Sequence, residues 1–327
     1  MHWLQHHWYH DTRLQWILFP VSLVFGMLVA IRRMMYRDGA LTGYRLLQPV
    51  IVVGNISVGG TGKTPLTLAL AQQLAERGWH PLIVSRGHGG SNRQPQHVHE
   101  TSKPQLAGDE PLLMAQRNIC PVWVGKDRVA TAQAALLAHP QCDVLLCDDG
   151  LQHYQLQRDV EIAVIDGTCG FGNGRMLPAG PLREPVSRLQ TVDAIVVNGG
   201  DAANGQYAMQ LTGDVFYNLL DQDKKAVPAD FAGTRNHAVA GIGNPQRFFQ
   251  HLESLGISCT PHAFPDHHPY SAADLAFTDC DAVLLTEKDA VKCSLFADAR
   301  FWALRVDARI DSALIDQILR KIAPHGS

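Results

Sequence analysis

The segment from Ser57 to Thr64 reads Ser-Val-Gly-Gly-Thr-Gly-Lys-Thr, which has the composition and spacing of a phosphate-binding loop. It follows a β-branched run and precedes a helix-forming stretch, which is the context that such a loop needs. Glycines let backbone N–H groups turn toward phosphate oxygens, and the following helix N-terminus adds partial positive charge. Lys63 can reach the β- and γ-phosphates, and the Thr64 hydroxyl can ligate Mg²⁺. The sequence therefore predicts a site for a nucleoside triphosphate.

The residues predicted to bind the nucleoside triphosphate are Ser57, Val58, Gly59, Gly60, Thr61, Gly62, Lys63 and Thr64. The first glycine of the usual motif is Ser57 here. Asp148 and Asp149 end an apolar run that begins at Asp143. An acid at the end of a strand is in the position of a residue that holds Mg²⁺ directly or through water. We therefore predict that Thr64, Asp148 and Asp149 bind the metal ion.

Two further segments carry groups that could move a proton. Asp109 begins a predicted helix, so its carboxylate either caps that helix or acts as a catalytic acid or base. The segment from Phe264 to Tyr270 reads Phe-Pro-Asp-His-His-Pro-Tyr, and in an extended chain its two histidines point in different directions. One of them can face a cleft, where an Asp–His pair can accept the proton of a hydroxyl.

The rest of the chain shows how these residues are positioned. Short, almost entirely apolar runs alternate with helical stretches such as Asp127 to Ala138, a pattern typical of a parallel sheet covered on both faces. The predicted strands of the first part are Val50–Gly54, Pro81–Ser85, Pro121–Gly125, Asp143–Asp148, Glu161–Asp166 and Asp193–Asn198. This rhythm predicts a P-loop NTPase-like, doubly wound α/β fold with a mainly parallel sheet.

A second set of elements follows a polar stretch near residues 199–205. His237–Gly243, Ala282–Ala290 and Phe301–Asp307 are predicted strands, and Asp311–Ile322 is a predicted closing helix. We expect a kinase domain over residues 36–200 and a smaller α/β domain over residues 201–327. The closing helix is expected to pack back on the first domain.

The N-terminal segment, residues 1–35, predicts a membrane-associated helix. Trp16 to Ile31 contains no charged residue, and Arg32 and Arg33 follow at once. Aromatic rings that favour the membrane interface precede the run, namely Trp3, Trp8 and Tyr9. A full span needs about 20 apolar residues, so both a span and a helix lying in the interface stay open. A buried core helix is the alternative to membrane association. A signal peptide is disfavoured because the start is rich in histidine and the run ends in two arginines.

Composition limits the classes of function. The formal net charge of −3 lacks the basic surplus of a nucleic-acid-binding protein. The seven cysteines contain no C-x-x-C pair, which favours a reduced compartment over a disulfide framework. The arginines are enriched near the N-terminus, where five of them stand against two aspartates up to Gln48. This local positive charge favours contact with anionic lipid.

Taken together, these segments resemble the tetraacyldisaccharide 4′-kinase family, the lipid A 4′-kinases of Gram-negative bacteria. The matching stretches extend from the phosphate loop almost to the C-terminus and are GNISVGGTGKTP (Gly54–Pro65), SRGHGG (Ser85–Gly90), GDEPLL (Gly108–Leu113), CDDGLQH (Cys147–His153), LPAGPLREP (Leu177–Pro185), AGIGNPQRFF (Ala240–Phe249), FPDHHPY (Phe264–Tyr270) and LTEKDAVK (Leu285–Lys292).

The resemblance implies transfer of the γ-phosphate of ATP to the 4′-hydroxyl of an acylated glucosamine disaccharide 1-phosphate, in lipid A biosynthesis at the cytoplasmic face of the bacterial inner membrane. It implies that Asp109 and His267 form the base pair that activates this hydroxyl, with Lys63 as the third catalytic residue. His267 is chosen over His268 from the Asp-His order. The implied substrate or phosphate contacts are Glu110, Arg128, Gln152, His153, Arg183 and Glu184.

Two other functions compete with this interpretation. A membrane-associated regulatory ATPase of the ParA or MinD type shares the Gly-Gly-Thr-Gly-Lys-Thr run, but its signature lysine is replaced by Val58 here. A non-catalytic nucleotide-binding module anchored to a membrane would bind ATP without turnover that depends on an acceptor. The proton-moving groups Asp109 and His267 would have no purpose in the regulatory ATPase.

Overall fold

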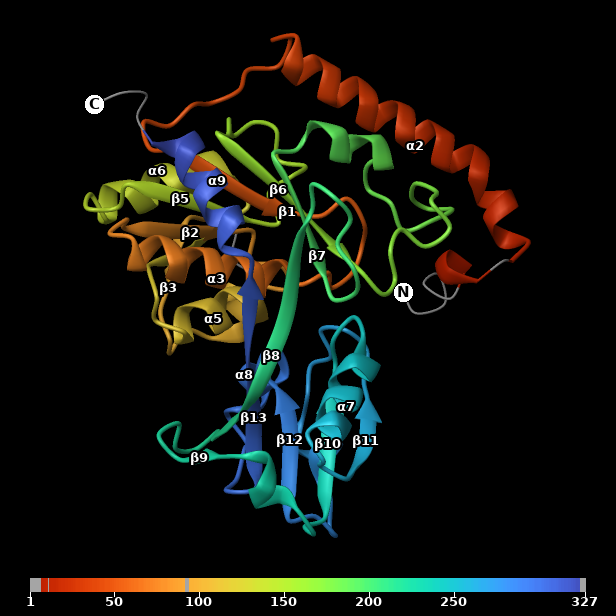
Figure 1. Ribbon diagram of the computed structural model, residues 1–327, viewed down its shortest axis with the longest axis vertical. Helices are drawn as coiled ribbons and strands as arrows, with labels where there is room; N and C mark the ends of the chain where they lie inside the picture. The colour runs from red at the N-terminus through yellow and green to blue at the C-terminus, as the bar shows by residue number, and fades with distance from the viewer. Residues whose placement is uncertain (1–6, 11, 92–93, 324–327) are drawn as a thin grey trace.

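The structure is a computed structural model that describes residues 7–10, 12–91 and 94–323. Trp3, one of the predicted interfacial rings, lies outside the described residues. Figure 1 shows a larger and a smaller lobe joined by two long strands, with one long helix along the outside of the larger lobe. The predicted domain boundary at residue 200 falls just before the first of these long strands and stays a prediction.

The α-helices have the bounds α2 (Leu14–Arg37), α3 (Lys63–Glu76), α4 (Pro104–Ala107), α5 (Asp109–Gln116), α6 (Arg128–Ala138), α7 (Pro245–Ser254), α8 (Glu287–Cys293) and α9 (Ser312–Ile322). The 3₁₀ helices are η1 (Val186–Thr191), η2 (Pro228–Phe231) and η3 (Ala272–Leu275). The strands are β1 (Val50–Gly54), β2 (Pro81–Ser85), β3 (Gln96–Val98), β4 (Val122–Val124), β5 (Val144–Asp148), β6 (Val160–Asp166), β7 (Ala194–Asn198), β8 (Tyr207–Asn218), β9 (Lys225–Ala226), β10 (Asn236–Ala240), β11 (Cys259–Ala263), β12 (Ala282–Thr286) and β13 (Phe301–Ile310).

These strands form one sheet within the described residues, in the order β11-β10-β12-β13-β8-β7-β6-β1-β5-β2-β4-β3, with β9 paired to β8. β1 lies in the middle of the larger lobe, parallel to both β5 and β6. Its side chains alternate between two cores, because Ile51 and Val53 pack on the side of α3 while Val50 and Val52 pack on the side of α6. The predicted doubly wound, mainly parallel α/β fold is confirmed.

The two lobes are joined by β8 and β13, which pair antiparallel from Trp302 opposite Asn218 to Ile310 opposite Met209. Strand β8 could not be predicted from the sequence, because its residues alternate irregularly between buried and exposed positions. After β13 the chain returns to the larger lobe, where Leu314 and Ile318 of α9 share a core with Leu66 of α3. Helix α9 therefore packs on the larger lobe.

One predicted strand is partly wrong. The run Ala282–Ala290 was expected to be extended throughout, but β12 ends at Thr286 and α8 begins at Glu287. The Thr286 hydroxyl accepts a hydrogen bond from the backbone N–H of Asp289, which caps the helix. Glu287 and Asp289 in the first turn add favourable charge at the helix N-terminus.

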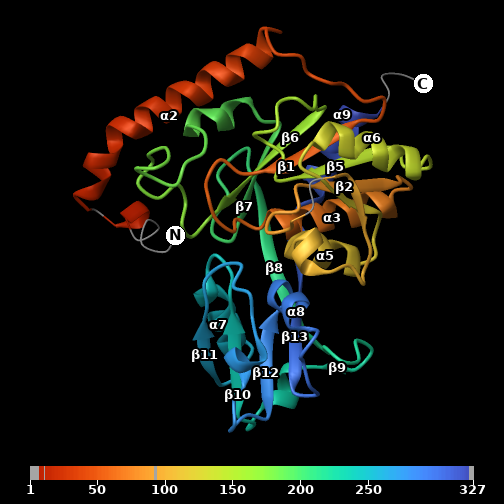
Figure 2. The ribbon, with the colours of Figure 1, turned by 180° about the vertical axis from the view of Figure 1, so that it is seen from behind.

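The N-terminal helix α2 lies on the outer surface of the larger lobe over η1, as Figures 1 and 2 both show. Hydrogen bonds are among its contacts with that lobe. The Ser22 hydroxyl donates to the Met176 carbonyl at 2.7 Å, and Arg33 donates to the Thr191 hydroxyl at 2.7 Å. Most of its apolar side chains are exposed, namely those of Trp16, Ile17, Val21, Leu23, Val24, Met27, Leu28, Ile31, Met34 and Met35.

Candidate active site

The phosphate loop connects β1 to α3 and is held by hydrogen bonds from side-chain amides. Asn55 donates from Nδ2 to the Thr61 hydroxyl at 3.2 Å, and Asn198 at the end of β7 donates to the Thr61 carbonyl at 3.0 Å. Gln152 donates to the Asn55 carbonyl at 2.9 Å. Gly62 has φ of +95°, and a Cβ there would lie 2.5 Å from the Asn198 amide. Glycine is therefore required at this position, where it allows the sharp turn into α3.

The first residues of the loop are held by the segment Leu177–Pro185, which the sequence analysis had singled out as a motif. Ser57 forms an antiparallel bridge with Leu182, and the Val58 N–H donates to the Pro181 carbonyl at 2.8 Å. The backbone N–H of Arg183 donates to the Ile56 carbonyl at 2.7 Å. This pairing brings the Arg183 side chain beside the acids at the end of β5.

Lys63, Arg183 and Asp149 form a charged cluster at the mouth of the loop. Lys63 Nζ lies 3.5 Å from Asp149 Oδ1, and Arg183 lies 3.1 Å from the same oxygen. Burial alone would raise the pKa of Asp149, but Lys63 and Arg183 lower it well below its usual range. Asp149 therefore stays ionised, with two cations beside it that a triphosphate can share.

Asp148 lies deeper, at the end of β5, and is almost fully buried. Burial first, and then the negative charges of Glu110 and Asp149, raise the pKa of Asp148 to about 7. The hydroxyls of Thr67 and Ser85 lie 3.4 Å from its carboxylate oxygens. The adjacent carboxylates of Asp148 and Asp149 fit a divalent cation, since added positive charge would offset their mutual repulsion.

Within the described ranges, no group of three or more His, Cys, Asp or Glu side chains forms a metal cluster. Mg²⁺ needs no such cluster, because it is commonly held by one or two carboxylates, substrate phosphates and water.

Asp109 and His267 come from different lobes and meet across the interface between them. Asp109 is the first residue of α5 in the larger lobe, and its Oδ2 lies 3.2 Å from Nδ1 of His267 in the smaller lobe. Asp109 is buried, and the His267 side chain is 28% exposed, which leaves the pair open to a bound acceptor. Neighbouring His268 instead faces Asp274, at 3.5 Å. The structure thus brings together the pair that the sequence analysis had chosen.

Backbone geometry also marks this region. Asn118, Asp149 and His267 are the non-glycine residues with positive φ in the part of the chain that the structure describes, and two of the three belong to the candidate site. Such a conformation costs about 1–3 kcal/mol and persists only where the surroundings enforce it. For His267, with φ of +61°, the backbone N–H donates to the Gly241 carbonyl at 3.3 Å.

The smaller lobe reaches the phosphate loop itself. A Cβ at Gly243 would lie 3.0 Å from the backbone nitrogen of Gly60, so the loop after β10 lies directly against the phosphate loop. Glu110, which follows Asp109, is bound by Lys288 of the smaller lobe at 3.1 Å. Burial would raise the pKa of Glu110, but Lys288 and then Lys63 lower it. The nucleotide loop and the Asp109–His267 pair therefore belong to one site.

Two of the remaining predicted contact residues donate hydrogen bonds to the backbone of the site. Arg128 is buried at the start of α6 and donates to the Asp148 carbonyl at 2.8 Å and the Asp149 carbonyl at 3.2 Å. Gln152 holds Asn55, as described above. Because Arg128 and Gln152 both donate to backbone carbonyls next to the site, we propose that they hold this backbone in place.

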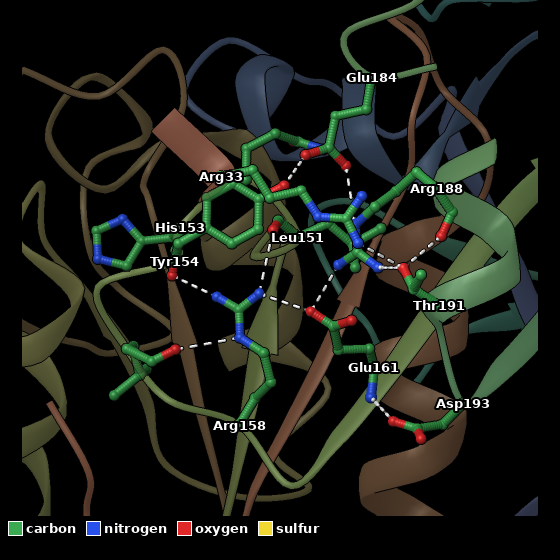
Figure 3. Close-up of polar contacts among 12 residues, drawn as sticks. Arg33, Leu151, His153, Tyr154, Arg158, Glu161, Glu184, Arg188, Thr191 and Asp193 are labelled. Atoms are coloured by element: carbon green, nitrogen blue, oxygen red, sulfur yellow. Dashed lines mark hydrogen bonds and ion pairs between the residues drawn. The ribbon is translucent and has the colours of Figure 1, made fainter. Parts of the chain in front are cut away.

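Glu184 is also turned inward, into the polar network drawn in Figure 3. It is 1% exposed, accepts a hydrogen bond from the Tyr154 hydroxyl, and lies 3.3 Å from Nε of Arg188. Arg188 in turn binds Glu161 at 2.6 Å. The carboxylate of Glu184 thus faces protein in this structure, and we propose that it fixes the backbone that presents Arg183.

Sequence reasoning missed several residues of the site. Asn55, Ser85 and Lys288 all lie inside motifs that the sequence analysis had recognised, but no role was assigned to them. Asn198 ends a predicted strand, and a polar residue at the carboxyl edge of a parallel sheet could have identified it. Its partner in the phosphate loop could not have been predicted without the fold.

A phosphate loop after the central strand, with acids at the end of the neighbouring strand β5, defines a P-loop nucleotide-binding protein. Residues 14–323 match the family described as tetraacyldisaccharide-1-P 4′-kinase, and the chain belongs to this family. It is 49% identical over 320 residues to a tetraacyldisaccharide 4′-kinase of Methylobacillus flagellatus, covering 98% of this chain and 96% of that protein. The kinase of Dechloromonas aromatica is 49% identical over 330 residues, covering 98% and 97%.

A solved structure agrees with these relatives. LpxK from Aquifex aeolicus, in complex with ATP, has a TM-score of 0.80 at 29% identity and covers 94% of this chain and 99% of that chain. The family match and the relatives confirm the kinase interpretation, and these comparisons give no support to the ParA or MinD alternative.

The buried environment of His153 predicts a pH effect on stability. Burial first, and then the charges of Arg128 and Arg158, lower the pKa of His153 to about 4. Between the ordinary histidine pKa of about 6.5 and this value, the unfolded chain binds a proton that the folded chain does not, so stability falls as pH falls. Replacing His153 by glutamine should make the decrease in melting temperature between pH 7.5 and pH 5 smaller. Equal decreases in the two proteins would contradict this assignment.

Proposed function

We propose that this chain transfers the γ-phosphate of ATP to the 4′-hydroxyl of a tetraacyldisaccharide 1-phosphate at a membrane surface. The observation that supports this most strongly is the meeting of Asp109 and His267 beside the phosphate loop, 3.2 Å apart. A nucleotide switch has no need of a proton acceptor at this place, whereas transfer to a hydroxyl requires one.

The phosphate loop and its cations hold the donor. Residues 57–64 surround the phosphates with N–H groups, and Lys63 at the start of α3 reaches the β- and γ-phosphates. Arg183, held beside Asp149, adds a second positive charge for the transferring group. Thr64, Asp148 and Asp149 would hold Mg²⁺. When bound, this ion neutralises charge on the β- and γ-phosphate oxygens.

The Asp109–His267 pair prepares the acceptor. Asp109, held by His267, orients the hydroxyl of the sugar and receives its proton as the oxygen attacks the γ-phosphorus. Phosphoryl transfer depends mainly on positioning and electrostatic stabilisation. Because Asp109 and His267 come from different lobes, catalysis depends on the two lobes lying against each other. The identity of the acceptor rests on the names of similar proteins, such as the tetraacyldisaccharide 4′-kinases of Methylobacillus flagellatus and Dechloromonas aromatica.

Helix α2 supplies the contact with the membrane in this proposal. It is the helix of the described chain that is long and apolar enough to cross a membrane, and only 11% of its apolar window is buried. The Ser22–Met176 hydrogen bond ties the middle of this helix to a loop of the folded lobe. A spanning helix would draw that loop into hydrocarbon, where free backbone polar groups are costly. We therefore propose that α2 lies in the interface rather than spanning the bilayer.

The location follows from the same features. Arg32, Arg33 and Arg37 flank the exposed apolar face and favour anionic lipid. ATP is available in the cytoplasm, so we propose the cytoplasmic face of the bacterial inner membrane. A lipid with several acyl chains leaves the bilayer at a cost of about 0.8 kcal/mol per CH₂ group, and an enzyme that works on its headgroup gains from staying there.

The role of the pair predicts a selective loss of turnover. Asp109→Asn and His267→Gln should each lower kcat for labelled lipid formation by about 10²- to 10⁴-fold, the usual contribution of proton transfer. The dissociation constant for ATP should stay within about twofold, because the phosphate loop is untouched. His268→Gln is the matched control and should keep wild-type kcat. Near-normal turnover in both pair variants would refute the base assignment, and ATP binding without any labelled lipid in the wild type would favour a non-catalytic module.

The proposed membrane contact predicts that polar substitutions on α2 release the protein from vesicles. A variant with Ile17→Gln, Val21→Gln, Val24→Gln and Leu28→Gln loses exposed apolar surface and should no longer sediment with vesicles that contain anionic lipid. A control with four exposed apolar residues replaced outside α2, Leu137→Gln, Leu220→Gln, Val227→Gln and Leu295→Gln, should sediment like the wild type. Full sedimentation of the α2 variant would place the membrane contact elsewhere.

A further inference from the structure

The helix α8 carries two lysines that no proposed step has used. It begins at Glu287 in the smaller lobe and packs against α5, the helix that begins with Asp109. Lys288 and Lys292 are four residues apart and so lie on the same face of the helix. Lys292 lies 2.8 Å from Asp289 and 3.9 Å from Asp109 Oδ2. Lys288 has the more informative contacts, because it touches the histidine of the pair.

The ammonium group of Lys288 has three neighbours, one for each of its hydrogens. Its Nζ lies 3.1 Å from Glu110 Oε1, 3.0 Å from Asp266 Oδ1 and 3.3 Å from Nε2 of His267. Glu110 belongs to the larger lobe, whereas Asp266 and His267 belong to the smaller one. The side chain of Lys288 is 16% exposed, so water competes little for these hydrogens.

The contact with Nε2 determines which nitrogen of His267 carries the hydrogen. A lysine ammonium only donates, so a hydrogen bond to Nε2 requires a bare lone pair on that nitrogen. The hydrogen of the neutral ring then lies on Nδ1, which faces Asp109 Oδ2 at 3.2 Å. The other charged group near Nε2 is Asp266 Oδ1, at 3.8 Å, which is too far for a hydrogen bond that would favour the opposite tautomer.

The neighbouring charges keep Lys288 protonated. Burial alone would lower the pKa of Lys288, but the carboxylates of Glu110 and Asp266 raise it well above its usual range. His88 faces His267 from the loop after β2, with ring centroids 5.2 Å apart. Burial and then His267 lower the pKa of His88, so this ring adds no positive charge near neutral pH.

We propose that Lys288 is a positioning residue for phosphoryl transfer, which fixes His267 as a donor from Nδ1 to Asp109 and links that histidine to α5 through Glu110. This inference rests on the proposed function. With Nε2 occupied by Lys288, the proton acceptor is the Asp109 carboxylate. In the transfer step the 4′-oxygen forms a bond to the γ-phosphorus, the bond from that phosphorus to the β–γ bridging oxygen breaks, ADP leaves, and the hydroxyl proton goes to Asp109.

The first test compares Lys288→Met and Lys288→Arg with the wild type in lipid phosphorylation. Loss of the ammonium group should lower kcat by about 10²-fold, the usual effect of a misplaced catalytic group, with little change in the KM for ATP. Arginine should restore part of kcat, because it also donates to Nε2 and to both carboxylates. Lys224→Met, at an exposed position between β8 and β9, is the matched control and should behave as wild type.

A pH profile separates positioning from a loss of folding. Removing a positive charge beside the pair makes its protonation easier, so the acidic limb of the kcat profile should move to higher pH in Lys288→Met. A variant that is merely less stable would keep the wild-type limb at a temperature well below its melting point. Unchanged kcat and an unchanged limb in Lys288→Met would overturn the proposal.

The second test does not depend on activity. In a ¹⁵N-histidine NMR spectrum of the full chain, with the His267 signals assigned by their loss in His267→Gln, the wild type should show a protonated Nδ1 and a bare Nε2. Lys288→Met should show a mixture of the two tautomers. A wild-type His267 that is protonated at Nε2 and bare at Nδ1 would overturn the inference. By contrast, a wild type with the expected tautomer and no lipid phosphorylation would contradict the proposed function alone.

Discussion

The hydrogen bond between His267 Nδ1 and Asp109 Oδ2 joins residues that are 158 positions apart in the chain. Neither lobe can form this contact alone, so the fold has to bring the loop after β11 back to the start of α5. β8 and β13 do this by carrying the chain out to the smaller lobe and back along one antiparallel ladder. The same arrangement of the two lobes places the Asp109–His267 pair near the phosphate loop.

The region between the Asp109–His267 pair and the phosphate loop is rich in charged side chains. Lys63 and Lys288 lie close to four acids, namely Glu110, Asp148, Asp149 and Asp266. The balance between burial and neighbouring charge differs from one acid to the next. Asp149 has two cations at hydrogen-bonding or ion-pair distance, which lower its pKa, whereas burial and neighbouring negative charge raise the pKa of Asp148 to about 7. In the proposed kinase, the metal ion and the triphosphate bind where carboxylates and cations lie side by side.

Much of this arrangement could be predicted from the sequence because it depends on local patterns. The apolar runs ending in Asp148 and Asn198 and the glycines before Lys63 specify a parallel sheet with a phosphate loop, and the structure contains both. The Asp109–His267 contact came from a family resemblance, since nothing in the spacing of two residues so far apart requires them to touch. Glu184 shows the limit most clearly. Its sequence motif suggested a ligand contact, but its burial against Arg188 depends on packing that only the fold reveals.

The central claim is that the two lobes together transfer phosphate to the 4′-hydroxyl of a lipid-linked sugar. A two-dimensional ¹H–³¹P correlation spectrum of the lipid, recorded after incubation with the protein, ATP and Mg²⁺, tests it most directly. The account predicts a new phosphate monoester signal correlated with the proton at position 4′, formed in step with ADP. Release of inorganic phosphate with no new lipid signal, or a phosphate correlated with another position of the sugar, would contradict it.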